Sequence, residues 1–178
     1  LYYKLYMPLK NIITVPDPLL KSISKPVDKI NDEIKILIND MFETMYNAPG
    51  VGLAAVQVGV PLRVVVIDIS KGDERKPHFF INPNIVWRSD KTSTYEEGCL
   101  SIPNQFAEIE RPESCRVEYI DLNNKKKEIE ASGLLSTCIQ HEIDHLNGVL
   151  FIDYLSKLKK NMIIKKVTKN NKSEKIVV

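Results

Sequence analysis

The first half of the chain contains an apolar periodicity typical of an amphipathic helix. From Asp28 to Asn47, apolar residues recur at steps of three and four, so they would share one helical face. These residues are Ile30, Ile34, Leu37, Ile38, Met41, Phe42 and Met45. Asp28 or Asn31 is suited to cap the N-terminus, and Pro49-Gly50 would end the helix. The pattern predicts a helix that packs its apolar face against the core.

Strand patterns occupy the middle of the chain. β-Branched and aromatic residues mark four segments, and the turn Asn123-Asn124-Lys125 would join the last two as a hairpin. The segments are residues 63–69, 79–87, 114–122 and 127–131. Pro83 lacks a backbone N–H, so we expect it to interrupt the second strand.

Helical periodicity returns towards the C-terminus. Residues 134–147 predict a second helix that stops at Gly148. Residues 156–167 predict a third, lysine-rich helix, followed by a frayed tail over residues 169–178. Helices therefore flank a central block of strands, which is the pattern of an α+β fold.

Size and composition limit the function classes. The four prolines of residues 1–27 predict an extended arm that wraps the core and starts with residues 1–10. With no repeat or linker, residues 1–178 are expected to form one domain. A net charge of +2 gives no argument for a nucleic-acid partner. No apolar run approaches the ~20 residues that span a bilayer, so no membrane partner is expected either.

The strongest chemical signal is the run His141-Glu142-Ile143-Asp144-His145. Residues four apart lie above one another on a helix, so both imidazoles would point to a common metal ion. Glu142 lies about 100° round the same helix, within reach of a water on that ion. A pair of histidines bound to acidic neighbours would give the same sequence without a metal.

A catalytic metal needs a third protein ligand. His78 is interpreted as a surface residue and Cys115 as a core residue. Cys138 would lie roughly 10 Å from His145 along the helix axis, too far to share one ion. Cys99 remains, in a glycine-containing turn flanked by carboxylates. Two histidines, one cysteine and an open position for water describe a catalytic site for Zn²⁺ or Fe²⁺.

The number of cysteines fits this interpretation. Three widely spaced cysteines argue against a disulfide framework and for a reducing compartment, where a thiolate can bind metal.

Three segments, residues 50–57, 97–101 and 140–145, resemble the signature motifs of peptide deformylases. They occur in the family's order and with similar spacing, and the similarity covers about residues 10–160. The resemblance implies a mixed sheet packed around the metal-bearing helix of a type 1 member. It also implies one divalent metal ion, with Fe²⁺ as the native metal and Zn²⁺, Ni²⁺ or Co²⁺ as substitutes.

The implied activity is removal of the formyl group from the N-terminal formylmethionine of newly made proteins, with release of formate. N-formylmethionyl nascent peptides are thus the expected partners. Metal-bound hydroxide would attack the formyl carbon, with Glu142 as general base and acid. By resemblance, the Gln57 side-chain amide and the Leu100 backbone N–H would stabilise the oxyanion.

Substrate-binding residues are also implied. Gly52 and Gly98 would let an extended peptide approach closely and add as a short strand. By similarity to the family, the substrate methionine would lie in an apolar pocket. Its residues would include Val51, Leu134, Thr137 and Cys138. Asp144 would fix a ligand histidine or a nearby arginine.

Two features set this chain apart from the family pattern. Phe106 occupies a position where many bacterial members have an arginine thought to engage the substrate. Lys outnumbers Arg about fourfold, and together with abundant Asn and Ile this suggests an AT-rich genome. That bias favours an organelle stroma, such as the plastid of a parasite, with a bacterial cytoplasm as the alternative. The basic third helix would suit docking near a ribosome, although a solvated face explains it more simply.

Two rival functions share the same helix motif. A zinc peptidase would take its third ligand from a residue beyond the helix, and Asp153 is the nearby candidate. A non-catalytic domain with a structural zinc would instead close the site with a fourth side chain.

Overall fold

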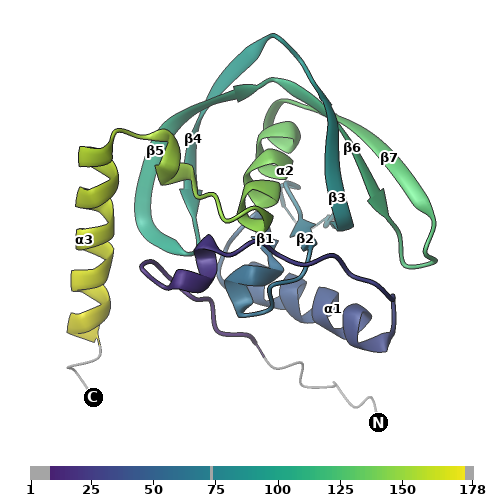
Figure 1. Ribbon diagram of the computed structural model, residues 1–178, viewed down its shortest axis with the longest axis horizontal. Coiled ribbons are helices and arrows are strands. Elements are labelled where there is room, and N and C mark those ends of the chain that lie inside the picture. Colours follow the sequence, from purple (N-terminus) through teal and green to yellow (C-terminus); the bar gives the residue numbers. More distant parts are fainter. Residues whose placement is uncertain (1–8, 73, 175–178) are drawn as a thin grey trace.

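The computed structural model describes residues 9–72 and 74–174 (Figure 1). Helix α1 (Asp32–Asn47) begins after Asn31, whose side chain accepts a hydrogen bond from the Ile34 N–H at 3.1 Å. Asn31 is therefore the N-cap, and the helix starts four residues later than Asp28. The predicted apolar face is largely buried against the central strands.

Five strands form the larger sheet, and all of its neighbours pair antiparallel. The order is β1-β2-β3-β6-β7. The bounds are Gly52–Ala54 for β1, Val64–Ile67 for β2, His78–Arg88 for β3, Ser114–Ile120 for β6 and Lys126–Ser132 for β7. The predicted hairpin around Asn123-Asn124-Lys125 is confirmed as the β6–β7 pair.

Strand β3 does not stop at Pro83, which corrects the predicted interruption. The register with β6 shifts between Ile81 and Asn84, so the proline falls where the ladder is already irregular. Asn82 has a positive φ of 51°, and its side chain hydrogen-bonds the backbone of Val27. The proline is thus accommodated by a bulge within a continuous strand.

A second sheet, the hairpin of β4 (Thr92–Cys99) and β5 (Ile102–Pro112), was not predicted. Its buried positions include Glu97 and Arg111, so the inward face lacks the apolar alternation that marks a strand. Cys99 is accordingly the last residue of β4, and the turn follows at Leu100 and Ser101.

Helix α2 (Gly133–Leu146) lies between the two sheets (Figure 1). Residues 136–143 are all buried, and Ile139 and Ile143 pack against the β2, β3 and β6 side of the core. Gly148 has a φ of +72°, the conformation that ends a helix, as predicted. A helix surrounded by sheets matches the expected α+β class, and the described strand pairs are antiparallel apart from an isolated parallel bridge.

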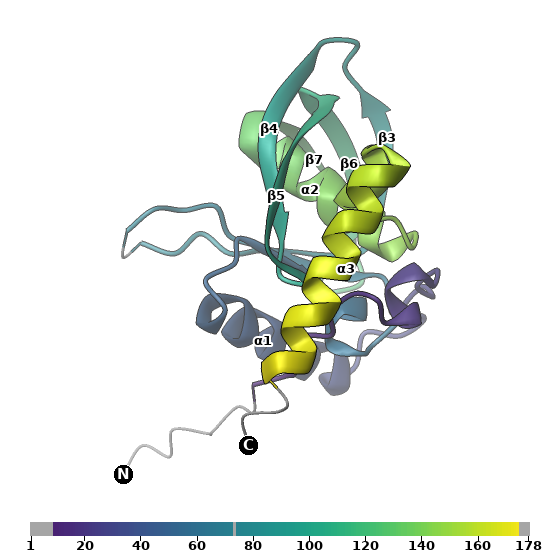
Figure 2. The same ribbon diagram turned by 90° about the vertical axis from the view of Figure 1, so that its left-hand side faces the viewer.

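Helix α3 (Lys157–Glu174) lies outside the β4–β5 hairpin (Figure 2), where it contacts β5 and the 3-10 helix η3 (Phe151–Tyr154). Its contacts are made by Ile163, Ile164 and Val167. The helix extends past the predicted end at residue 167, so residues 169–174 are helical rather than frayed. Within the described part of the chain, none of the helices has the length and apolar character that crossing a membrane requires.

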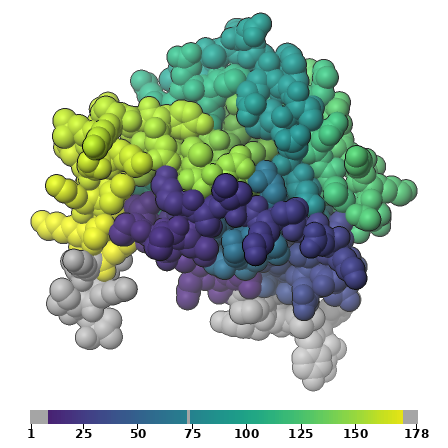
Figure 3. Space-filling view, viewed as in Figure 1, coloured from purple at the N-terminus to yellow at the C-terminus, as the bar shows by residue number. Residues whose placement is uncertain are grey.

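The N-terminal segment 11–25, called the strap below, crosses the face shown in Figure 3. It contains a turn at Val15 and Pro16 and the 3-10 helix η1 (Pro18–Lys21), with irregular backbone on either side. Backbone N–H groups of Ile13, Val15 and Ser24 donate to the carbonyls of Gln57, Ser101 and Leu146 at 2.8, 3.0 and 2.9 Å. The strap therefore joins three segments that are distant in sequence. Most of the predicted arm, residues 1–10, lies outside the described residues.

Candidate metal centre

Helix α2 and strand β4 bring Cys99, His141 and His145 together. One ligand atom from each residue lies within 4.8 Å of the others. The Cys99 Sγ is 3.3 Å from the His145 Nε2. Metal–sulfur and metal–nitrogen bonds of ordinary length in a tetrahedron separate such atoms by about 3.5 Å. The three side chains therefore fit a single divalent ion.

A charged network fixes His141 from behind. Its Nδ1 lies 2.8 Å from the Glu97 Oε2, which leaves the Nε2 free to face the centre. Arg111 donates to both Glu97 oxygens, at 2.5 and 3.0 Å, and to Asp144 at 2.8 Å. Burial opposes ionisation of Glu97, but the hydrogen bonds from His141 and Arg111 hold its pKa below the ordinary value. Asp144 thus binds an arginine, the second of its two expected roles.

His145 has a different environment. The residue is 1% exposed, and within the part of the chain that the structure describes its Nδ1 has no hydrogen-bond partner. Burial lowers its pKa well below the ordinary value, and the nearby His141 lowers it further. A neutral imidazole is the form that binds a metal, so the environment of His145 suits a ligand.

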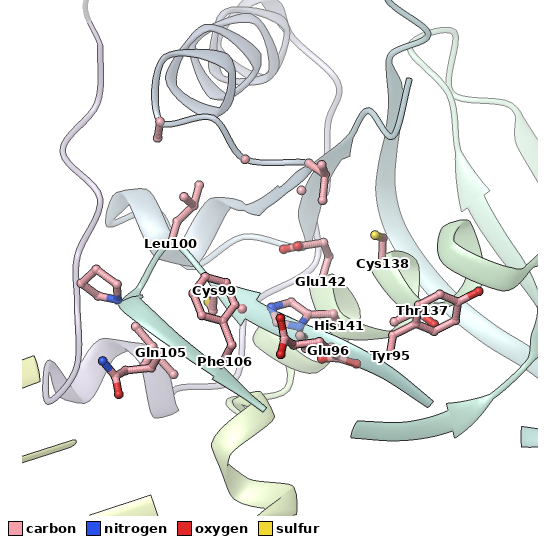
Figure 4. Close-up of a pocket in the computed structure, with 18 of the residues that line it drawn as sticks. Tyr95, Glu96, Cys99, Leu100, Gln105, Phe106, Thr137, Cys138, His141 and Glu142 are labelled. Atoms are coloured by element: carbon pink, nitrogen blue, oxygen red, sulfur yellow. Dashed lines mark hydrogen bonds and ion pairs between the residues drawn. The ribbon is translucent and has the colours of Figure 1, made fainter. Parts of the chain in front are cut away.

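Glu142 is a buried carboxylate at the inner wall of the pocket (Figure 4). Its Oε2 has no hydrogen-bond partner among the described residues, and burial raises its pKa to about 7. Gly52 makes room for it, since a Cβ at Gly52 would lie 2.3 Å from the Glu142 Oε1. An unpaired carboxylate with a pKa near neutrality can accept and return a proton.

Gln57 and Leu100 lie beside the centre. The Gln57 Oε1 accepts from the Ala54 N–H at 2.8 Å, and the Nε2 donates to the Ser101 Oγ at 3.0 Å. The same Nε2 is 3.4 Å from the Cys99 Sγ, so the amide donor faces the candidate metal site. Leu100 follows Cys99 in the turn and lines the pocket.

A pocket of about 580 Å³ opens in front of these residues. It is lined by all six residues for which a substrate-binding role is expected, namely Val51, Gly52, Gly98, Leu134, Thr137 and Cys138. Burial raises the pKa of the Cys138 thiol to about 12, so this side chain stays neutral and does not act as a thiolate.

Other candidates lie elsewhere. Cys115 is fully buried in the core, and His78 stacks on Phe80 at the start of β3. Asp153, the third ligand of a rival peptidase, pairs with Lys21 and Lys160 instead. The sequence did not reveal Arg111, because its place beside Glu97 depends on the hairpin.

Comparison with known proteins gives a consistent result. Residues 9–161 match the family described as polypeptide deformylase. The peptide deformylase of Pelagibacter ubique is 61% identical over 97% of this chain and 100% of its own length. That of Brucella suis is 57% identical over 92% and 94%. The structure of peptide deformylase from Ehrlichia chaffeensis in complex with actinonin is 46% identical, covers 91% of this chain and 97% of its own, and has a TM-score of 0.87. This chain therefore belongs to the peptide deformylase family.

Proposed function

We propose that this protein hydrolyses the formyl amide of N-terminal formylmethionine in newly made proteins and releases formate. Family membership supports the reaction. The observation that carries the proposal is the unpaired, buried Glu142 carboxylate beside the Cys99–His141–His145 cluster. The donor set of one thiolate and two imidazoles suits Fe²⁺ or Zn²⁺, and we propose Fe²⁺ as the native metal.

The residues divide the chemistry between them. A divalent ion at this site would lower the pKa of a bound water and polarise the formyl oxygen. Glu142 takes the proton from that water through its free Oε2 and returns it to the departing amine. The raised pKa of about 7 suits both directions of proton transfer near neutral pH.

Charge that develops on the formyl oxygen needs hydrogen-bond donors. The Gln57 Nε2 is held in place by Ala54 and Ser101 contacts of the same side chain, so it needs no reorganisation during the reaction. The Leu100 backbone N–H, in the turn after Cys99, is proposed as the second donor. Both groups lie next to the cluster on the side of β4.

The pocket is proposed to bind the substrate's methionine. Its lining includes Val51, Leu134, Thr137 and Cys138, a largely apolar set that suits an unbranched thioether. Gly52 and Gly98 would leave the main chain of the peptide accessible to β1 and β4. The complex of the Ehrlichia relative with actinonin supports a ligand site in this family, and we expect actinonin to compete with substrate here.

The relatives described above are bacterial. They do not support the organellar location that the residue composition suggested. We propose that this protein acts in a bacterial cytoplasm. Contact with the ribosome would depend on the lysines of α3. Lys157 and Lys159 are exposed, whereas Lys160 is paired with Asp153. Co-sedimentation with ribosomes at low and high salt would test this contact.

The primary experiment measures formate release from a formyl-Met-Ala-Ser peptide by anaerobically prepared, Fe²⁺-loaded protein. We expect release that Glu142→Ala abolishes, with bound iron measured in both proteins. Glu96→Ala is the matched control, because Glu96 is an exposed carboxylate at the pocket mouth, and it should retain activity. Absence of formate from metal-loaded wild type would overturn the proposal, and cleavage of unformylated peptides would favour the zinc peptidase.

A further inference from the structure

Phe106 is an aromatic residue exposed at the mouth of the pocket (Figure 4). It is 63% exposed, more than Val51 or Leu134, the other exposed large apolar residues of the pocket lining. In the β4–β5 ladder it lies opposite Gly98, one residue before Cys99. An exposed ring is therefore placed next to the candidate reaction centre without being required for the core.

The ring is held although it is exposed. A Cβ at Gly98 would lie 2.5 Å from the Phe106 Cε1 and 2.7 Å from the Cδ1, so the ring occupies the space above a backbone that has no side chain. Gly98 thus leaves the space into which the phenyl group packs. A contact surface that is already positioned loses little conformational freedom when a ligand binds.

The charged groups around the ring are negative. Among the described residues that line the pocket there is no lysine or arginine. Glu96, which is exposed on β4, contributes negative charge to the mouth. Leu100 and Pro103 add apolar surface to the lining. This surface suits an apolar side chain and repels an acidic one.

We propose that Phe106 determines substrate preference for the residue that follows the formylmethionine. This inference rests on the proposed function, which places the formyl group at Cys99 and the methionine among Leu134, Thr137 and Cys138. A peptide anchored at both points leaves the pocket past Gly98 and the ring of Phe106. Substrates with an apolar or aromatic second residue gain a contact with the ring, and those with an acidic second residue meet Glu96 without a compensating cation.

The test compares kcat/KM for formyl-Met-Xaa-Ser peptides in which Xaa is Ala, Leu, Phe or Glu. Wild type should favour Leu and Phe over Ala by about fivefold and disfavour Glu by a similar factor. Phe106→Ala should remove the preference for Leu and Phe. Phe106→Leu should preserve the preference for Leu, and Phe106→Arg should raise the ratio of Glu to Leu. Trp87→Ala, which removes a 42% exposed aromatic residue of β3 outside the pocket lining, should leave all ratios unchanged.

The outcomes separate the two proposals. Formate release from the Ala peptide by wild type and by all variants would support the proposed function whatever the preference. If release occurs but Phe106→Ala leaves the ratios among the four peptides as in wild type, the role of Phe106 is refuted. If no peptide releases formate, the proposed function itself fails. Circular dichroism of each variant checks that the hairpin remains folded.

Discussion

The floor and the rim of the pocket are built in opposite ways. The floor includes Glu97 and His141, and it is supported from behind by buried charged groups that depend on one another: Glu97 binds both His141 and Arg111, and Arg111 also binds Asp144. The rim consists of exposed side chains such as Glu96 and Phe106, each of which can change without stranding a partner. The difference indicates that the chemistry is fixed by the floor, whereas substrate preference can vary at the rim.

The largest expected effect comes from breaking the network of the floor. Arg111→Leu leaves Glu97 buried without its bidentate partner, and we expect a loss of about 3–5 kcal/mol in the free energy of unfolding. The measurement is chemical denaturation of metal-free protein. Arg116→Leu is the control, because Arg116 is 42% exposed and pairs with Glu128 and Glu130 on the surface. It should cost at most about 1 kcal/mol. Equal losses for the two variants would contradict the comparison.

A second effect concerns the charge of Glu142. Burial raises its pKa from 4.5 to about 7, so the folded state binds this proton more tightly than the unfolded state does. Its contribution to stability is present below pH 4.5 and is lost as the pH rises through about 7. Glu142→Gln should therefore stabilise the metal-free protein at pH 8 by up to roughly 3 kcal/mol, and the difference should shrink towards pH 4.

Thermal or chemical unfolding at several pH values measures this difference. Zn²⁺ should reduce the advantage of Glu142→Gln, because a cation stabilises the neighbouring carboxylate. Glu96→Gln, which changes an exposed carboxylate at the rim, is the matched control. A stability difference for Glu142→Gln that is the same at pH 4 and pH 8 would argue against a raised pKa.

The smallest of the three effects compares two glycines of the pocket. In Gly52→Ala the new methyl group displaces the Glu142 carboxylate, and we expect kcat to fall about 100-fold, since misplacing a catalytic group by about 1 Å costs this much. In Gly98→Ala the new methyl group displaces the exposed ring of Phe106 towards solvent and leaves the catalytic groups in place. Its kcat on formyl-Met-Ala-Ser should stay within about tenfold of wild type. A greater loss in Gly98→Ala would show that the rim also governs the chemistry.

Local patterns made the helices and part of the site predictable. The four-residue spacing of His141 and His145 fixes their common direction on any helix, and α2 ends where Gly148 predicts. Hydrophobic periodicity likewise located α1, although its first residue depended on which side chain, Asn31 or Asp28, made the cap.

The β4–β5 hairpin was not predicted because its buried charged residues, which support the site, break the hydrophobic pattern of a strand. A strand with one buried face should alternate apolar and polar residues, but this one buries Glu97 and Arg111 to support His141. Arg111 is fourteen residues from Glu97 along the chain, and only the fold brings them together. Local sequence patterns therefore could not predict the Glu97–Arg111 pair that supports His141.

The strap has a consequence for the order of synthesis. Its residues are translated before the partners that they bind; Ser24, for example, hydrogen-bonds Leu146, the residue after His145. Ile13 and Val15 must likewise wait for Gln57 and Ser101. The strap residues stay without these native partners until residue 146 has left the ribosome, a delay characteristic of folds with distant contacts. An enzyme proposed to act on emerging chains therefore cannot complete its own site until residues 141–146 have themselves emerged.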